Sequence, residues 1–320
     1  MPDLALAVDI GGTKLAAALV ASDGTVRERR VRPTAAASAD PEAVWRPLAE
    51  LVAEVRAAAG GDPIVGVGVG TAGPIHLPAG TISPVNIHAW REFPMLDRLA
   101  EAVPGVPVRL AGDGVCAAAG EHWQGAGRGV DDLLVLVVST GVGGGVVQGG
   151  RLAAGPTGNA GHVGHMVVEV DGEPCACGGR GCVEALASGP NMVTWALRAG
   201  WRPPVPEPTG VDLAVAARAG DAYAQRAFRR SARAVAAGIV SAAAMADLRR
   251  VVIGGGVAAA EDLLFPPLRE AVAEHAKLGF LRDLRVEPAS LGSSAGLVGA
   301  AALIHEPKVY GGPGVAATAG

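Results

Sequence analysis

The chain has 320 residues, of which half are hydrophobic and 18% are charged, and its formal net charge is −4. This balance excludes an intrinsically disordered chain, and the length exceeds that at which a single hydrophobic core stops growing, so we expect two lobes. Glycine numbers 47 and proline 23, whereas aromatic residues make up 3%, which excludes a large aromatic core.

The basic residues give no indication of a nucleic-acid or membrane partner. Lysine and arginine total 27, but the lysines are only Lys14, Lys277 and Lys308. The arginines are scattered apart from the broken string Arg27–Arg32, and the pI near 6.0 matches no basic binding surface. The N-terminal residues lack the basic region of a secretion signal. We therefore expect no nucleic acid, no membrane and a cytoplasmic location.

Two stretches of the chain share one pattern of strand, glycine-rich turn and strand. The first runs from Leu4–Asp9 to Lys14–Val20, and the second from Leu133–Val138 to Gly145–Gly150. This repetition indicates an internally duplicated protein with one such hairpin in each lobe.

The remaining pattern alternates strands with helices and then becomes mainly helical, which predicts an α/β fold. The expected strands are Ile64–Val69, Val106–Leu110 and Val251–Ile253. The expected helices are Pro41–Ala59, Pro94–Val103, Ala117–Trp123, Met192–Ala199, Val211–Ala219, Ala222–Leu248 and one near Glu261. We expect a small α/β lobe at 1–114 with a C-terminal helix at about 293–306 packed back on it. A large lobe at 115–292 and a flexible tail at 307–320 complete the predicted division.

The first motif that carries chemistry is Asp9-Ile-Gly-Gly-Thr-Lys14. Its adjacent glycines, Gly11 and Gly12, let backbone N–H groups approach an anion, while Thr13 adds a hydroxyl donor and Lys14 a cation. Asp9 is a candidate to hold Mg²⁺ through water. The alternative is an ordinary hairpin turn, in which paired glycines are common.

A second turn, Ser139-Thr-Gly-Val-Gly-Gly-Gly145, has the same ingredients without the lysine. Facing the first turn, its Thr140 and Gly141 would grip a polyphosphate from the other lobe. Neither turn is a P-loop, because the required glycine and lysine spacing is absent. The cluster Gly254–Gly256 follows a strand, where it would admit a flat base or ribose or simply form a tight turn.

The strongest local signal is the loop Cys175-Ala-Cys-Gly-Gly-Arg-Gly-Cys182, which holds Cys175, Cys177 and Cys182. In a cytosolic protein such a cluster favours metal over disulfide, and three thiolates with one imidazole complete a closed tetrahedral zinc shell. The spacing alone leaves open whether His162 or His165 is the fourth ligand. A redox loop is the alternative. Cys116 stands apart and is interpreted as a small buried side chain.

Two acidic residues are candidates for contact with a substrate. Asp113 follows the strand Val106–Leu110 in a loop of small residues, which leaves its carboxylate uncrowded at the carboxyl end of a strand. The alternative is an ordinary helix N-cap. Glu184 follows the cysteine loop, which would orient it, and its alternative is a solvated surface acid.

Taken in order and spacing, the two glycine turns, Gly164-His165 and the cysteine loop with its following Glu184 resemble the ROK family (repressors, open reading frames, kinases). Within the family the chain is similar to the actinobacterial glucokinase-like sugar kinases. The resemblance runs from about Leu4 to Ala302. It implies a two-lobe actin-like (ribonuclease H-like) ATPase fold with a cleft between the lobes, ATP and Mg²⁺ as cofactors, and phosphorylation of a hexose, glucose first, at the 6-hydroxyl. It also implies a homodimer or homotetramer.

The resemblance assigns roles to matching residues. Asp113 matches the family's general base, and His165 matches a ligand that completes a structural zinc shell with the three cysteines of the loop. The residues matched to sugar contacts are Gly73, Asp113, His165 and Glu184. The motifs and the resemblance together give these candidate nucleotide-binding residues: Asp9, Gly11, Gly12, Thr13, Lys14, Thr140, Gly141, Gly254 and Gly255.

The chain departs from the family's glucokinase pattern at two positions. Gly112 stands where an Asn usually precedes the base, and His162 stands where a Glu usually begins the motif that ends in His165. Each lost contact to a sugar hydroxyl weakens discrimination by about 1–3 kcal/mol, and His162 is a candidate replacement. Another hexose, an amino sugar or a cyclitol therefore stays open as substrate, as does polyphosphate as donor.

Two rival functions come from other classes of protein. A transcriptional repressor of the same family carries a helix-turn-helix before the first motif, and here that motif begins at Asp9. A non-catalytic sugar-binding protein is suggested by Gly112 and His162, but the retained Asp9, Lys14 and Asp113 argue against it.

Overall fold

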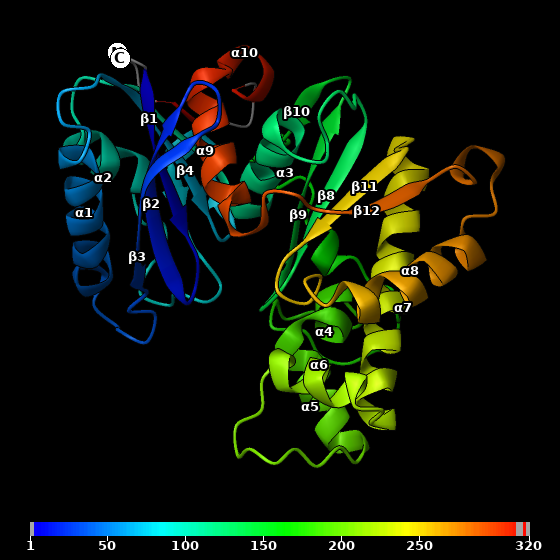
Figure 1. The fold of residues 1–320 in the computed structure, drawn as a ribbon. Coiled ribbons are helices and arrows are strands. Elements are labelled where there is room, and N and C mark those ends of the chain that lie inside the picture. Colours follow the sequence, from blue (N-terminus) through cyan, green and yellow to red (C-terminus); the bar gives the residue numbers. More distant parts are fainter. Residues whose placement is uncertain (1–2, 312–315, 318–320) are drawn as a thin grey trace. The chain divides into compact units, whose positions relative to one another are not determined.

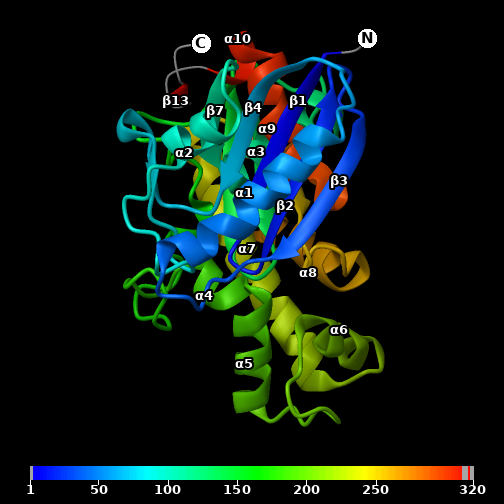
Figure 2. The same ribbon diagram turned by 90° about the vertical axis from the view of Figure 1, so that its left-hand side faces the viewer.

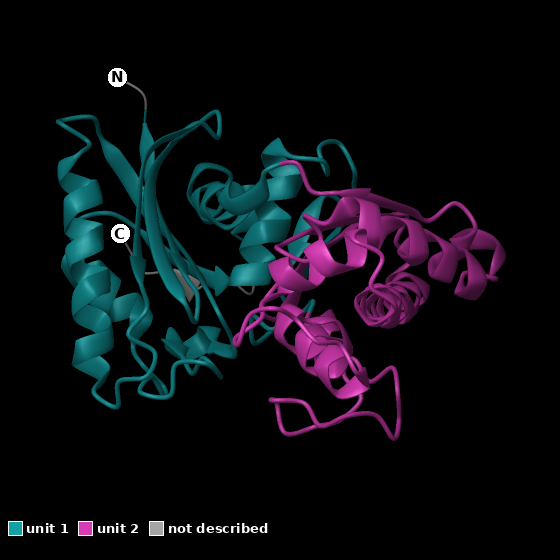
Figure 3. Ribbon diagram, turned by 60° about the horizontal axis from the view of Figure 1, so that its bottom comes forward, with its two compact units in different colours: residues 1–131, 145–161, 291–320 teal, residues 132–144, 162–290 magenta. Residues whose placement is uncertain are grey.

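The structure is a computed structural model that describes residues 3–311 and 316–317. The chain forms two compact units, coloured separately in Figure 3. Unit 1 takes in residues 1–131, 145–161 and 291–320, and unit 2 takes in residues 132–144 and 162–290. The chain therefore passes between the units more than once, and each unit is assembled from distant parts of the sequence.

Unit 1 is built on a six-stranded sheet with the order β13-β7-β4-β1-β2-β3. Its strands are β1 (Leu4–Ile10), β2 (Lys14–Ala21), β3 (Val26–Pro33), β4 (Ile64–Thr71), β7 (Val108–Gly112) and β13 (Ala316–Ala317). β1, β4 and β7 run parallel, whereas β2 returns antiparallel to β1 through the first glycine turn. The carboxyl ends of the three parallel strands therefore lie at one edge of the sheet.

The two faces of this sheet are covered by different helices, as Figures 1 and 2 show. On one face Leu4, Leu6 and Val8 of β1 pack in a core with α1 (Pro41–Ala57) and α2 (Met95–Ala102). On the other face β1 presents alanines to α9 (Ala295–His305), which also packs against α3 (Asp113–Gln124). The alternation of large and small side chains along β1 thus gives each face a core of its own.

Some of the glycines are needed where α9 packs on the small-residue face. A Cβ on Gly68 of β4 would lie 1.8 Å from the carbonyl oxygen of Ala300, and one on Gly299 would lie 1.6 Å from that of Cys116. No side chain fits at either position, so α9 approaches both the sheet and α3 at backbone distance. The remaining elements of unit 1 are β5 (Ile75–His76), η1 (Leu77–Ala79), β6 (Thr81–Ile82), β10 (Arg151–Ala153), η4 (Gly292–Ser294) and α10 (Pro307–Tyr310).

The second sheet has the order β10-β9-β8-β11-β12, and the division between the units falls within β9. Its further strands are β8 (Leu133–Val138), β9 (Val142–Gln148), β11 (Arg250–Gly254) and β12 (Arg285–Pro288). The helices of unit 2 are η2 (Val163–His165), α4 (Val183–Ala187), α5 (Gly189–Ala199), α6 (Gly210–Arg218), α7 (Ala222–Ala246), α8 (Glu261–His275) and η3 (Gly279–Leu281). One side of α7 is buried, and the helix packs against α8, α4 and α5. Among the described residues no helix is both long and apolar enough to cross a membrane.

The compact units divide the chain differently from the predicted lobes. The prediction assigned 115–131 and 145–161 to the large lobe, whereas both segments belong to unit 1. The reason lies in α3, which begins at Asp113 and packs against α9, so that the helix stays with the first sheet. The predicted helix at 293–306 is α9 in unit 1. The predicted flexible tail falls partly outside the described residues, although Pro307–Tyr310 forms α10 and Tyr310 is buried.

A buried carboxylate fixes two chain segments of unit 1. Glu121 of α3 is fully buried, and its Oε2 accepts a hydrogen bond from Ala126 N while its Oε1 accepts one from Leu291 N, both at 2.9 Å. Leu291 is the residue at which the chain re-enters unit 1. One side chain therefore holds both the end of α3 and this return segment.

Replacing Glu121 with Gln should lower the free energy of unfolding by about 1–3 kcal/mol, because one acceptor becomes an NH₂ group that faces a backbone N–H. Urea unfolding monitored by circular dichroism measures the change. Glu101→Gln, an exposed carboxylate on α2, is the matched control. A loss no larger than that of the control would contradict the bridging role.

Candidate active site

The parallel strands of unit 1 carry two acidic residues to one edge of the sheet. Asp9 in β1 pairs with Gly70 in β4, which pairs with Ala111 in β7. Asp113 follows the end of β7 directly and opens α3. The register therefore places both carboxylates at the same carboxyl edge, where ligands bind in open α/β sheets.

Asp113 is the first residue of α3, and the N-cap position is held by Gly112. The interpretation of Asp113 as a helix N-cap is therefore wrong. Its side chain is exposed, and Oδ1 accepts a hydrogen bond of 2.7 Å from Gly114 N. The helix N-terminus favours negative charge at this position. Asp113 thus presents an oriented carboxylate that a substrate can reach.

Cys116 lies beneath both carboxylates. Burial raises the pKa of its thiol well above the usual value, and the negative charges of Asp9 and Asp113 raise it further. Burial also raises the pKa of the Asp9 carboxyl, against the opposing effects of Lys14 and Arg29. A half-buried carboxylate of this kind gains stability from a nearby cation. Asp9 therefore fits the predicted role of holding Mg²⁺ through water.

The first glycine turn is closed by a hydrogen bond of 3.0 Å from Gly11 N to the carbonyl oxygen of Lys14. Thr13 and Lys14 are exposed at its tip. The structure gives a specific reason for Gly12: a Cβ there would lie 2.2 Å from Nδ2 of Asn86. A side chain at position 12 would therefore displace the Asn86 carboxamide from the turn.

Gly73 lies just beyond β4 and is tied to the loop that carries Asn86. The carbonyl oxygen of Gly73 accepts a hydrogen bond of 3.1 Å from Val85 N. The sequence analysis did not single out Asn86, since nothing in the local pattern indicates that it lies against Gly12. Unit 1 thus brings together Asp9, Gly11, Gly12, Thr13, Lys14, Gly73 and Asp113 at one end of its sheet.

In unit 2 the second glycine turn is held by Glu184. The Oε2 atom of Glu184 accepts a hydrogen bond of 2.8 Å from Val142 N, and a Cβ on Gly141 would lie 2.7 Å from the same oxygen. Ser139 N donates to the carbonyl oxygen of Gly141 at 2.8 Å. The turn that exposes Thr140 is therefore linked directly to α4, the helix that follows the cysteine loop.

A cavity of about 670 Å³ opens beside this turn in unit 2. Its lining is mostly apolar and combines the turn with the starts of α5, α6 and α8; it includes Ser139, Thr140, Gly189, Pro190, Val193, Val211, Gly256 and Val257. Gly254 and Gly255 do not line it. Gly255 has a left-handed backbone with φ +100, and a Cβ there would meet the carbonyl oxygen of Val138 at 2.4 Å. The nucleotide roles of Gly254 and Gly255 stay predictions.

The cysteine loop gathers four metal-ligating groups. The ligand atoms of His165, Cys175, Cys177 and Cys182 all lie within 4.8 Å of one another. His165 Nδ1 lies 3.8 Å from Cys175 Sγ, and Cys177 Sγ lies 3.8 Å from Cys182 Sγ. The geometry selects His165, which the spacing alone left open. Three thiols and one imidazole at these distances fit a tetrahedral zinc ion with no open position.

Burial affects the ionisation of the thiols in this cluster, and one glycine allows the backbone of the loop to turn. Burial raises the pKa of the Cys182 thiol to about 12, and the thiols of Cys175 and Cys177 add to the effect, so a thiolate here requires a cation. Gly181 has φ +69, and a Cβ there would lie 1.6 Å from the carbonyl oxygen of Glu169.

His162 is exposed and its ring stacks on His165 with centroids 6.0 Å apart. It therefore adjoins the cluster without belonging to it.

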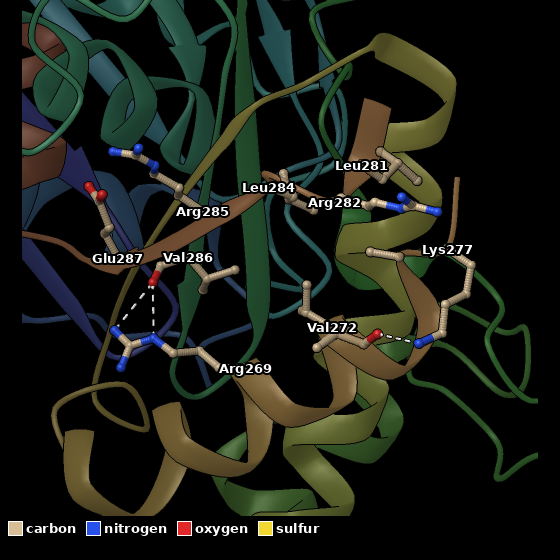
Figure 4. A pocket seen from close by; sticks show the side chains of 11 residues that line it. Arg269, Val272, Lys277, Leu281, Arg282, Leu284, Arg285, Val286 and Glu287 are labelled. Atoms are coloured by element: carbon tan, nitrogen blue, oxygen red, sulfur yellow. Dashed lines mark hydrogen bonds between the residues drawn. The ribbon is translucent and has the colours of Figure 1, made fainter. Parts of the chain in front are cut away.

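A second cavity in unit 2, of about 720 Å³, contains none of the predicted residues. It lies between α8 and β12 and is shown in Figure 4. Arg269 donates to the carbonyl oxygen of Val286, and Lys277 donates to that of Ala273. Figure 4 shows Arg285 leaving β12 on the side opposite to Val286, so the positive charges of this cavity do not converge.

Comparison with known proteins identifies relatives along nearly the whole chain. The model of the ROK family matches residues 5–307. N-acetylmannosamine kinase of Escherichia fergusonii is 39% identical over 307 residues, which cover 95% of this chain and 99% of the relative. Glucokinase of Streptomyces coelicolor is 35% identical over 318 residues, which cover 95% and 98%. The crystal structure of a ROK family glucokinase from Streptomyces griseus, in complex with glucose and AMPPNP, matches with a TM-score of 0.82 at 33% identity and covers 95% of this chain and 99% of that one.

The strand order, the duplicated hairpin and this structural match all indicate the same fold. It is the two-lobe actin-like ATPase fold. This confirms the predicted fold class. The chain belongs to the ROK family, which confirms the resemblance drawn from its glycine turns and cysteine loop.

Proposed function

We propose that this protein is a sugar kinase that transfers the γ-phosphoryl group of ATP to the 6-hydroxyl of a hexose, with Asp113 as general base. The observation that carries the proposal is the placement of Asp9 and Asp113 at one sheet edge, next to the Gly11–Lys14 turn. Phosphoryl transfer requires a phosphate-binding turn, a carboxylate near the metal and one carboxylate to take the hydroxyl proton. The names of the relatives support the same class.

Each group has a separate task in this proposal. Thr13, Lys14 and Thr140 bind phosphate oxygens. Asp113 accepts the proton of the 6-hydroxyl as its oxygen attacks the γ-phosphorus atom. Asp9 holds Mg²⁺ through water, and the ion, when bound, neutralises phosphate charge.

The cysteine loop has a supporting task. Zinc held by His165 and the three cysteines has no open position, so it braces the loop and takes no part in the chemistry. Glu184 follows the loop and joins it to the Thr140 turn through Val142 N. Glu184 of α4 would thus hold both the bound sugar and the turn that carries Thr140.

We propose an N-acylhexosamine, N-acetylmannosamine first, as the preferred sugar. Gly112 leaves space beside Asp113, since a Cβ there would meet only Val115, at 3.7 Å. That space admits a larger substituent than a hydroxyl. The imidazole of His162 can donate to an acyl oxygen, which a carboxylate cannot. The N-acetylmannosamine kinase at 39% identity supports this choice, while the glucokinase relatives make glucose the second candidate.

A coupled assay of ADP release over a panel of sugars tests the function. It includes N-acetylmannosamine, N-acetylglucosamine, glucose, mannose and a cyclitol, with phosphorus NMR to locate the phosphate on the product. We expect the highest kcat/KM with N-acetylmannosamine. A higher value with glucose would overturn the choice of sugar, and no turnover with any of them would overturn the kinase assignment. Polyphosphate in place of ATP tests the donor.

Restoring the glucokinase pattern should shift the substrate preference. The double variant Gly112→Asn, His162→Glu should raise the ratio of kcat/KM for glucose to that for N-acetylmannosamine by at least about tenfold, since each restored contact contributes about 1–3 kcal/mol. Gly279→Asn is the matched control, because a Cβ at Gly279 meets no neighbour within 4 Å. An unchanged ratio in the double variant would show that these positions do not select the sugar.

A further inference from the structure

We propose that the carboxamide of Asn86 is a further substrate-contacting group of the active site, which donates a hydrogen bond to the γ-phosphoryl group of the bound nucleotide. This inference rests on the proposed kinase function and adds a residue that the sequence motifs did not single out.

The first ground is the contact of Asn86 with the phosphate turn. A Cβ on Gly12 would lie 2.2 Å from Nδ2 and 2.5 Å from Cγ of Asn86. The amide group therefore lies directly against the backbone of the turn that offers Thr13 and Lys14. A donor at this place meets any anion that the turn binds.

The second ground is the position of the loop between two parts of the site. Val85 N donates to the carbonyl oxygen of Gly73 at 3.1 Å, so the residue before Asn86 is tied to the segment matched to the sugar. Asn86 itself lies against Gly12 on the phosphate side. The group that moves from nucleotide to sugar is the γ-phosphoryl group, and it must pass where these two segments meet.

The third ground is the rigidity of the loop. The guanidinium of Arg91 donates to the carbonyl oxygens of Pro84 and Ile87 at 2.9 and 3.0 Å. Trp90 is fully buried, stacks on Phe93 with ring centroids 4.7 Å apart and donates Nε1 to the carbonyl oxygen of Pro41 at 3.2 Å. A donor on a braced loop needs little reorganisation to meet developing charge.

The fourth ground is the state of the amide. Asn86 is exposed, and across the described residues no hydrogen bond engages its side chain. The next residue, Ile87, is fully buried in the core of unit 1. The loop is thus anchored on one side while the carboxamide remains available to a ligand at the turn.

Nucleotide binding by three variants tests the inference. Isothermal titration with Mg²⁺ compares ADP with AMPPNP, which differ at the γ-phosphoryl group. Asn86→Ala should weaken AMPPNP binding on the order of tenfold and leave the Kd for ADP within twofold. Asn86→Asp should weaken AMPPNP binding further, because a carboxylate repels the phosphate. Asn86→Ser, which keeps a donor, should recover part of the loss.

The outcomes separate this inference from the proposed function. An equal loss of ADP and AMPPNP affinity in Asn86→Ala would show a structural role, and unchanged AMPPNP affinity would show no contact; either result overturns the inference. A raised KM for the sugar with unchanged AMPPNP affinity would also overturn it and place the amide on the acceptor. If the wild-type protein binds AMPPNP but phosphorylates no sugar, the proposed function fails while the γ-phosphoryl contact is still measured.

Discussion

Replacing Asp113 with Asn should lower kcat by about 10²–10⁴-fold, because the amide cannot take the proton of the attacking hydroxyl. The substitution preserves the local structure, since the Asn oxygen can accept the 2.7 Å hydrogen bond from Gly114 N that Asp113 Oδ1 accepts. The side chain is exposed, so no core packing is lost. We therefore expect wild-type thermal stability and nucleotide affinity together with a large loss of turnover.

The matched control for this variant is Asp97→Asn. Asp97 is also an exposed acid in the first turn of a helix of unit 1, here α2, and it lies outside the candidate site. Coupled ADP release at saturating ATP and sugar measures kcat for both variants. Wild-type turnover in Asp113→Asn would remove the residue from the role of general base. A fall in Asp97→Asn of similar size would show that the assay reports helix stability.

The sequence predicted the elements that place the site more reliably than the contacts within it. The strand from Leu4, its glycine turn and the strand from Lys14 follow from local pattern alone, and so do Leu133–Val138 and the long helix from Ala222. Period-two and helical patterns report burial along one segment, which is a local property. The grouping of three cysteines with a histidine was predicted for the same reason, since one short loop carries the thiols.

What the sequence did not predict depends on contacts between distant segments. Asn86 lies against Gly12 only because β1 and the loop after β4 meet at one sheet edge, and no local signal marks that meeting. The hydrogen bond from Val142 N to Glu184 joins the second turn to α4 in the same way. The local pattern also did not predict that α3 packs against α9. Gly120 and Gly299 lie far apart in the sequence, and their close contact exists only in the folded structure.

Removing one thiol from the cysteine loop should release the metal and loosen the sugar site. In Cys177→Ser we expect the zinc content to fall from about one ion per chain to near zero, because a closed shell of four ligands loses one. Cys177 is exposed, so the substitution removes little packing and its effect reports the metal. Loss of a ligand that binds only the folded state should cost about 3–4 kcal/mol when the free ion exceeds its Kd by 100-fold to 1,000-fold.

Loss of the metal should weaken sugar binding through the residues that are hydrogen-bonded to the cysteine loop. Val183 N donates to the carbonyl oxygen of Met166, and Val168 N donates to that of Gly181, so the metal loop, the His165 segment and α4 form one hydrogen-bonded piece. We expect the KM for the sugar to rise more than the KM for ATP.

Elemental analysis measures the zinc content, thermal melts measure the stability, and steady-state kinetics measure the two KM values. Wild-type protein treated with a chelator should match the variant. Cys116→Ser, outside the loop, should keep its zinc. Full zinc content in Cys177→Ser would refute the ligand assignment, whereas zinc loss with an unchanged KM for the sugar would separate the metal from sugar binding.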